Sequence, residues 1–219
     1  MFSVGVAPFS LLLPSGKVNL HAEWAYADKK SLSLIAYIPR PTTVPGLVAD
    51  NIDLEDGAEA TVTNRFTSYG AVLEHRFYLS KAALRGFYLA PYTRYNNFAV
   101  SRTTQNEGSG YTTTVKGSIG GFGLGAAAGV QMRLGDFITL DATIVGVDFK
   151  WLRGRISYTT DDPENDLAAF RDKVDEAVGD IPIIGSRLTS AIDGNSVKVR
   201  TPGFLVPAYR FNLTVNYTF

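Results

Sequence analysis

The sequence predicts an all-β fold: an eight-stranded antiparallel up-and-down transmembrane β-barrel with a helical insertion in its last extracellular loop. Three observations lead to this prediction. Eight segments alternate apolar and polar residues, as half-buried strands do. Short turns and long loops alternate between these segments. The charged residues of the strands fall on the face opposite the apolar one. We expect a single domain over residues 1–219.

The strictest alternation is in the last strand, residues 209–219. Apolar or aromatic residues occupy every odd position of this segment, and polar residues occupy the even positions between them. A soluble sheet edge is the alternative interpretation, but a long apolar edge strand promotes aggregation. We therefore expect the odd positions to face lipid, namely Phe211, Leu213, Val215, Tyr217 and Phe219.

Seven further segments complete the predicted barrel. We expect Pro8 to interrupt the first of them, since proline is confined to bulges and edges of sheets. Short turns at 28–30, 80–85 and 135–136 share one rim, whereas the loops 39–61, 101–111 and 152–206 share the other, the short turn at 14–16 being the exception. The seven segments are 2–13, 17–27, 31–38, 62–79, 86–100, 112–134 and 137–151.

The loop 152–206 holds the predicted helix. Asp162 followed by Pro163 is typical of a helix start, and a helix is predicted near 163–179. A second helical piece is predicted over 184–192. The apolar face of the first helix must be buried, either as a cap over the barrel mouth or against a partner. That face consists of Leu167, Phe170 and Val174.

The polar face of the strands carries seven charged residues. A soluble lipocalin-like barrel is disfavoured, because there the apolar face points inward. Charges inside a narrow barrel should pair, since an isolated buried charge is costly, and we expect a structural network that blocks an open channel. A glycine row over 121–129 should make room for bulky interior side chains, a small-ligand cavity being the alternative. The expected network is Glu23, Glu74, Arg76, Arg94, Arg133, Asp141 and Arg210.

Composition excludes several classes of function. Lys plus Arg and Asp plus Glu are 21 each, so the net charge is zero and nucleic-acid binding is not expected. The absence of cysteine excludes disulfides and thiolate metal sites. The two histidines lack metal-ligand spacing, so we expect no metal and no cofactor. The first residues lack the basic start of a signal peptide, and we expect the numbering to begin on a mature chain.

One group of residues raises the question of catalysis. His21 and Glu23 lie two apart on the predicted inner face, and Ser31 or Ser33 could lie beside them. A Ser/His/Glu group resembles the site of the outer-membrane lipid A deacylases. Those enzymes, however, place the site on the lipid-facing side. We therefore expect no catalytic residues and no enzymatic activity. His75 should face lipid near the short-turn rim.

The terminal strand with its aromatic last residue resembles the insertion signal of bacterial outer-membrane barrels. The whole pattern resembles the small eight-stranded members of that class, and the hairpin over 76–92 resembles uncharacterised small barrels of Bacteroidota. The resemblance implies the outer membrane of a Gram-negative bacterium, contact with its lipid and insertion by the barrel-assembly machinery. The hypothesis for function is a structural or partner-binding role, with other outer-membrane or surface proteins meeting the loop 152–206. A narrow conduit or small-ligand pocket is the alternative, and a lipid-modifying enzyme is a third.

Overall fold

The structure is a computed structural model of the whole chain. It describes residues 1–12, 17–40, 42–43, 60–80, 82–106, 110–162, 167–168 and 189–219.

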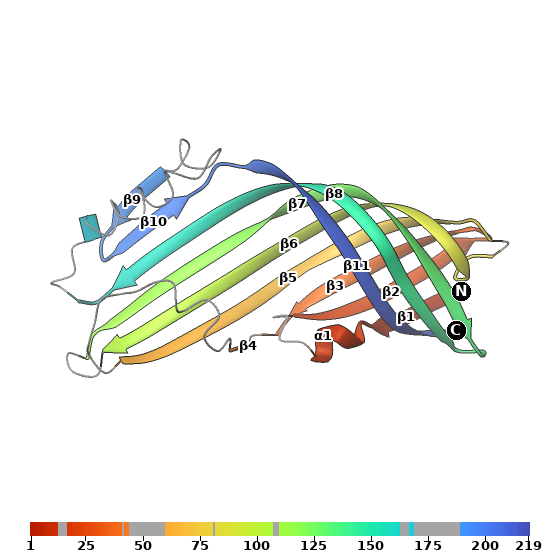
Figure 1. Cartoon of the computed structure of the whole chain (residues 1–219), viewed down its shortest axis with the longest axis horizontal. Coiled ribbons are helices and arrows are strands. Elements are labelled where there is room, and N and C mark those ends of the chain that lie inside the picture. Colours follow the sequence, from red (N-terminus) through yellow and green to blue (C-terminus); the bar gives the residue numbers. More distant parts are fainter. Residues whose placement is uncertain are drawn as a thin grey trace.

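Eight antiparallel strands form a closed ring, which confirms the predicted barrel (Figure 1). Each strand pairs with the next along the chain, and the last strand pairs with both the first and its predecessor. Three short strands lie off the ring: β4 Thr42–Thr43, β9 Thr189–Asp193 and β10 Ser196–Arg200. The ring strands are β1 Phe2–Val6, β2 Lys17–Ala27, β3 Lys30–Pro39, β5 Ala60–Tyr78, β6 Gly86–Asn106, β7 Thr112–Leu134, β8 Ile138–Thr160 and β11 Phe204–Thr218.

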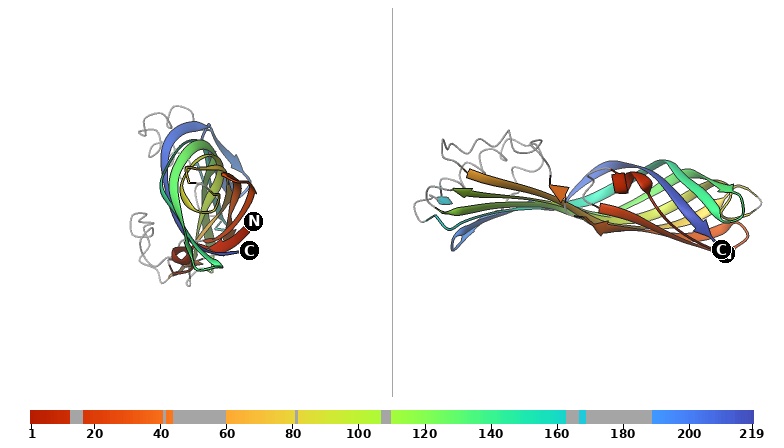
Figure 2. Two further views of the ribbon diagram at one scale, coloured as in Figure 1. Left: turned by 90° about the vertical axis from the view of Figure 1, so that its right-hand side faces the viewer. Right: turned by 90° about the horizontal axis from the view of Figure 1, so that it is seen from below.

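The ring is complete at one end only. All eight strands take part at the end that holds the chain termini and the short turns, and there they form the closed barrel. We call this end, at the right of Figure 1, the lower end. Four strands, β5 to β8, continue far beyond it as an open curved sheet, to which β10 and β9 are added (Figures 1 and 2). We call this part the extension: residues 60–69, 96–106, 112–121 and 152–160 with β9 and β10.

The extension corrects several predicted strand ends. β6 runs to Asn106 rather than 100, β8 runs to Thr160 rather than 151, and β11 begins at Phe204 rather than 209. The stretches added to β6 and β8 are rich in threonine, serine and charge, so their weak apolar pattern indicated loops. They are nevertheless strands because each pairs in continuous register with a neighbour, and threonine suits a pleated sheet.

The N-terminal segment differs from the prediction. β1 ends at Val6, and the predicted continuation to residue 13 is instead a short helix, α1 Pro8–Leu12. Proline has no backbone donor and suits the first turn of a helix, which explains why the strand stops at this position. Ser10 Oγ donates to the Ala7 carbonyl at 2.6 Å and accepts from the Asn19 backbone N–H at 3.0 Å. These bonds attach α1 to β2.

The predicted helices of the last loop have a mixed outcome. The prediction of a second helical piece over 184–192 is wrong for 189–192, because those residues belong to β9, which forms a hairpin with β10. The glycine of Asp193-Gly194-Asn195 has a positive φ of 56° and closes that hairpin. Of the first helix, Leu167 and Ala168 are helical, and the rest of 163–179, with Phe170 and Val174, lies outside the described residues.

The two faces of the closed barrel differ in the way the alternation predicts. Outward side chains are large, apolar and exposed, as the lipid-facing band of a transmembrane barrel requires. Aromatic residues flank the lower end, where Phe2 stacks on Phe219 at 6.2 Å and Phe137 on Tyr217 at 5.7 Å. His75 lies outward, 4.4 Å from the Phe77 ring. The chain is an outer-membrane-type β-barrel. Within the described residues, no helix has the length and apolarity to cross a membrane.

Candidate functional site: the barrel interior

The lower interior is organised around Arg76 on β5. Its Nη1 donates to Glu23 Oε2 at 2.9 Å and to Asp141 Oδ2 at 2.7 Å, and its Nε donates to Glu74 Oε2 at 2.7 Å. Arg210 of β11 forms an ion pair with the other oxygen of Glu74. We call these five residues the Arg76 cluster. They come from four strands, β2, β5, β8 and β11, and so join opposite walls of the barrel.

Two tyrosines add hydrogen bonds to the Arg76 cluster. Tyr78 Oη donates to Glu23 Oε1 at 2.6 Å, and Tyr88 Oη donates to Asp141 Oδ1 at 2.9 Å. The Arg76 guanidinium lies over the Tyr88 ring, 4.4 Å from its centroid. Within the cluster, Arg76, Glu74 and Asp141 are 0% exposed. Because every carboxylate has a cationic partner, the large cost of burying these charges is offset.

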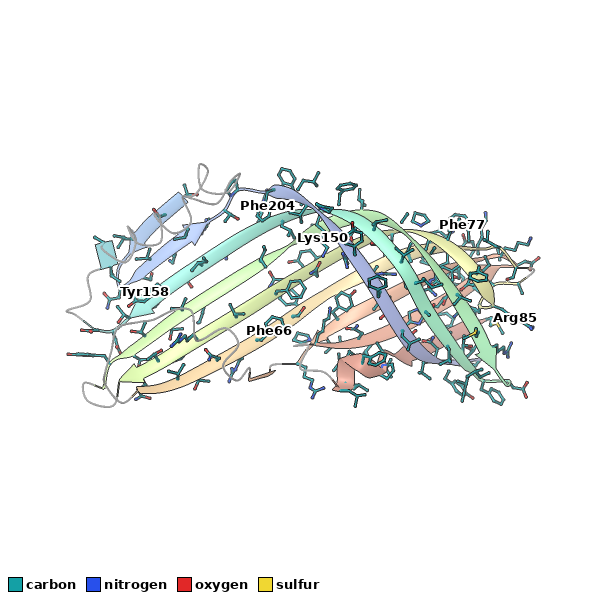
Figure 3. The ribbon with its side chains drawn as sticks, viewed as in Figure 1. Phe66, Phe77, Arg85, Lys150, Tyr158 and Phe204 are labelled. Carbon is teal, nitrogen blue, oxygen red and sulfur yellow. The ribbon has the colours of Figure 1, made fainter. Side chains whose placement is uncertain are left out.

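A second ion pair lies nearer the extension. Arg94 of β6 donates to Asp148 of β8, with Nη2 to Oδ1 at 2.5 Å and Nε to Oδ2 at 3.1 Å. Tyr92 Oη also donates to Asp148 at 3.1 Å. Lys150, two residues farther along β8, is buried beside them (Figure 3). Asp148 and Lys150 were not among the predicted network residues.

A bulge in β8 explains why Asp148 was missed. The register of β8 slips between Ala128 and Gly129 of β7, and the adjacent residues Ile144 and Val145 both face outward. Inward positions are therefore odd up to Thr143 and even from Gly146 onward. The signal was present in the sequence, because the apolar residues change from even to odd positions at this point.

One predicted member lies outside the network. Arg133 is exposed, and its Nη2 donates to the backbone carbonyl of Asp136 in the turn after β7. The prediction that Arg133 joins the interior charges is wrong, because its position is the last inward one on β7 and already reaches the rim. A long side chain there turns to solvent at little cost.

The glycine row of β7 packs against large interior side chains. A Cβ at Gly129 would overlap the hydroxyl of Tyr88, and one at Gly123 would lie 2.6 Å from Asp148 Oδ2. The row therefore makes room for the two ion-pair layers, as the packing interpretation predicted. A small-ligand cavity does not follow from it.

The serine, histidine and glutamate group lies together in the lower interior. His21 Nε2 is 2.8 Å from Ser33 Oγ, and His21 Nδ1 is 2.7 Å from Asn216 Oδ1. Ser31 instead donates to Glu23. Ser33 and His21 are 0% and 3% exposed. A serine hydroxyl so buried cannot meet a substrate in this arrangement, so the contacts support a structural role.

His21 also belongs to a group with metal-ligand chemistry. Ligand atoms of His21, Glu23 and Asp141 lie within 4.8 Å of one another. The Arg76 Nη1 atom lies between the two carboxylates, at 2.9 and 2.7 Å from them. The guanidinium thus takes the position that a cation would need, so these residues do not fit a metal ion.

Two solved structures show a distant similarity to the chain. No protein-family model matches the chain, and no curated protein matches it. A major outer membrane protein from Thermus thermophilus is similar in structure, with a TM-score of 0.43 and 13% identity over 100% of this chain and 98% of that one. CarO from Acinetobacter baumannii has a TM-score of 0.41 and 8% identity over 99% and 97%. Neither likeness indicates a function, and the resemblance to Bacteroidota barrels stays a prediction.

Proposed function

We propose that this protein is a non-conducting barrel of the bacterial outer membrane, with a structural or partner-binding role carried by its extension. The Arg76 cluster is the observation that supports the closed lumen. It joins strands on opposite walls, and its central residues are inaccessible to solvent from either end. An eight-stranded barrel has an interior that side chains fill, so little additional closure is needed.

The extension supports the binding role. Its inward face carries a cluster of Tyr158, Val197 and Val199, against which Leu167 of the last loop packs. Leu167 was predicted on the interaction face of that loop, and its contact favours a loop that folds over the sheet rather than one held free for a partner. The partner would then meet the outer face and the rim of the extension.

Conductance in planar lipid bilayers tests the closed lumen. We expect no steady conductance steps from the wild type. The triple variant Arg76→Ala, Glu23→Ala, Asp141→Ala should show small steps, because it removes the groups that cross the lumen. A matched variant, Arg133→Ala, should remain silent, since Arg133 lies at the rim. Steady large conductance from the wild type would overturn the proposal.

A specific observation favours a second candidate function, the small-ligand pocket. A pocket of about 580 Å³ lies where β1 ends, between α1 and β11. Its volume falls in the range of roughly 300–1,000 Å³ that small-molecule sites occupy.

A further inference from the structure

The wall of the barrel is interrupted at one place. β1 pairs with β11 from Ser3–Thr218 to Val6–Val215, and with β2 as far as Val6–Leu20. Beyond Val6 no strand of the described chain joins β11 to β2. The helix α1 lies there instead, held to β2 by the Ala7 N–H donating to the Asn19 carbonyl at 3.1 Å (Figure 1).

The pocket passes through this interruption. Part of its lining faces outward, namely Phe211 and Leu213 of β11, Ala142 of β8 and Phe9 of α1. Four other lining residues face the lumen, namely Lys17, Asn19, Thr143 and Asn212. Opposite faces of a continuous sheet cannot line one pocket. The pocket is therefore an opening from the lipid side of the wall into the lumen.

The opening lies at the depth of the membrane. Phe211 comes eight residues before Phe219. On a strand tilted by about 45° this spacing is roughly 19 Å of height, inside an apolar band roughly 25 Å tall. Sheet edges do not occur within hydrocarbon unless they line a cavity that satisfies them. The opening therefore calls for an occupant that is apolar on one side and polar on the other.

The lumenal side of the opening holds unused hydrogen-bonding groups. Among the described residues, Asn212 Nδ2 and Asn19 Oδ1 are buried without a hydrogen-bond partner. Arg210 is 5% exposed, its Nη2 contacts Thr143 Oγ1 of the lining at 3.3 Å, and its Nε and Nη1 have no partner in the same part of the chain. With Lys17 in the lining, this side is rich in hydrogen-bond donors.

We propose that this opening binds a single-chain fatty carboxylate taken from the adjoining membrane leaflet. The tail lies against Phe9 and Phe211, and the carboxylate accepts hydrogen bonds at Asn212 and from the cations beside it. The proposal rests on the proposed outer-membrane barrel and names the ligand of its pocket. Arg76, Glu23 and Asp141 of the Arg76 cluster lie below the site, so a ligand exchanges with the leaflet and the outer lumen.

Binding of cis-parinarate, a fluorescent long-chain carboxylate, to the barrel in lipid nanodiscs tests the proposal. We expect saturable binding that the methyl ester of the same acid does not reproduce. Ala142→Trp fills the opening, and Asn212→Leu removes its donor. Each should raise the Kd about tenfold or more. The matched control Ala126→Trp places the same side chain on the lipid face of β7, away from the pocket, and should leave the Kd within about twofold.

Three outcomes would overturn the proposal. Non-saturable fluorescence, equal in all variants, would show partition into the bilayer alone. Equal affinity for the ester would show that no carboxylate is recognised, and loss of binding in Ala126→Trp would show a site elsewhere on the wall. Heat-dependent gel mobility verifies that each variant is folded. If Ala142→Trp does not fold, Asn212→Leu alone tests the proposal. These readouts are separate from conductance, so the proposal of a ligand and the proposal of a closed lumen can each be rejected without the other.

Discussion

The closed barrel and the extension share strands β5 to β8, but the apolar face of these strands points outward in the barrel and inward in the extension. Along β8, the inward residues are Asp141 and Asp148 in the barrel. In the extension the inward residue is Tyr158, which is labelled in Figure 3. The outward residues change from Phe149 to Arg155. What covers the outer face decides which side is apolar: lipid around the barrel, water around the extension. The apolar face of β8 changes from outward to inward just beyond Trp151, which marks the upper limit of the membrane on this strand.

The largest expected effect is in the barrel interior. Arg76→Ala should destabilise the protein by about 3–5 kcal/mol, because it leaves three buried carboxylates without their shared partner. Urea unfolding followed by gel mobility measures the change. Arg94→Ala is the comparison, and it should cost less because Arg94 has one carboxylate partner. A cost of Arg76→Ala below that of Arg94→Ala would contradict the central position of Arg76.

The outer faces give the next contrast. Val215→Arg places a charge on the lipid face and should cost about 2–4 kcal/mol if the residue lies near the bilayer midplane. Thr63→Arg, on an exposed position of the extension, should change stability by no more than about 0.5 kcal/mol. Refolding into lipid vesicles at graded urea concentrations measures both. Equal costs for the two variants would show that the membrane boundary does not lie between the barrel and the extension.

The apolar cluster of the extension should be locally important only. Tyr158→Ala removes the largest member of a small cluster, and the four-strand sheet should open without unfolding the ring. We expect faster proteolysis and faster amide exchange in 152–160, with the unfolding midpoint of the barrel unchanged. A matching loss of barrel stability would show that the two regions fold as one unit.

The smallest effect concerns charge on the outer face of the extension. Arg155 on β8 pairs directly with Arg200 on β10, and no carboxylate of the described chain forms an ion pair with either. Like charges directly opposite each other destabilise a sheet. Arg155→Glu should therefore slow amide exchange in β10, corresponding to about 0.2–1 kcal/mol. Arg155→Lys, which keeps the charge, should have no such effect.

The sequence alone predicted the barrel well where the alternation of apolar and polar residues is unbroken along a strand. β2 and β7 have the predicted ends because their alternation is unbroken, and the clustering of Arg76 with Glu23 and Glu74 follows from their shared parity. The extension was missed because its polarity differs from the rule for lipid-facing strands. Asp148 was missed because a bulge changes the parity. The pocket could not be predicted, since it depends on where β1 ends in space.

The seam between β1 and β11 has a consequence for how the protein assembles. It joins residues from the two ends of the chain through four register pairs, and Phe2 and Phe219 exchange backbone hydrogen bonds at 2.8 and 2.9 Å. Every other ring junction links strands that follow one another around the ring in chain order, with a shorter stretch of chain between them. Closing the ring requires contact across almost the whole chain, which costs the most loop entropy and limits the folding rate. We therefore expect ring closure to be the last and slowest step of folding. We also expect the junction between β1 and β11 to separate first when force is applied to the barrel.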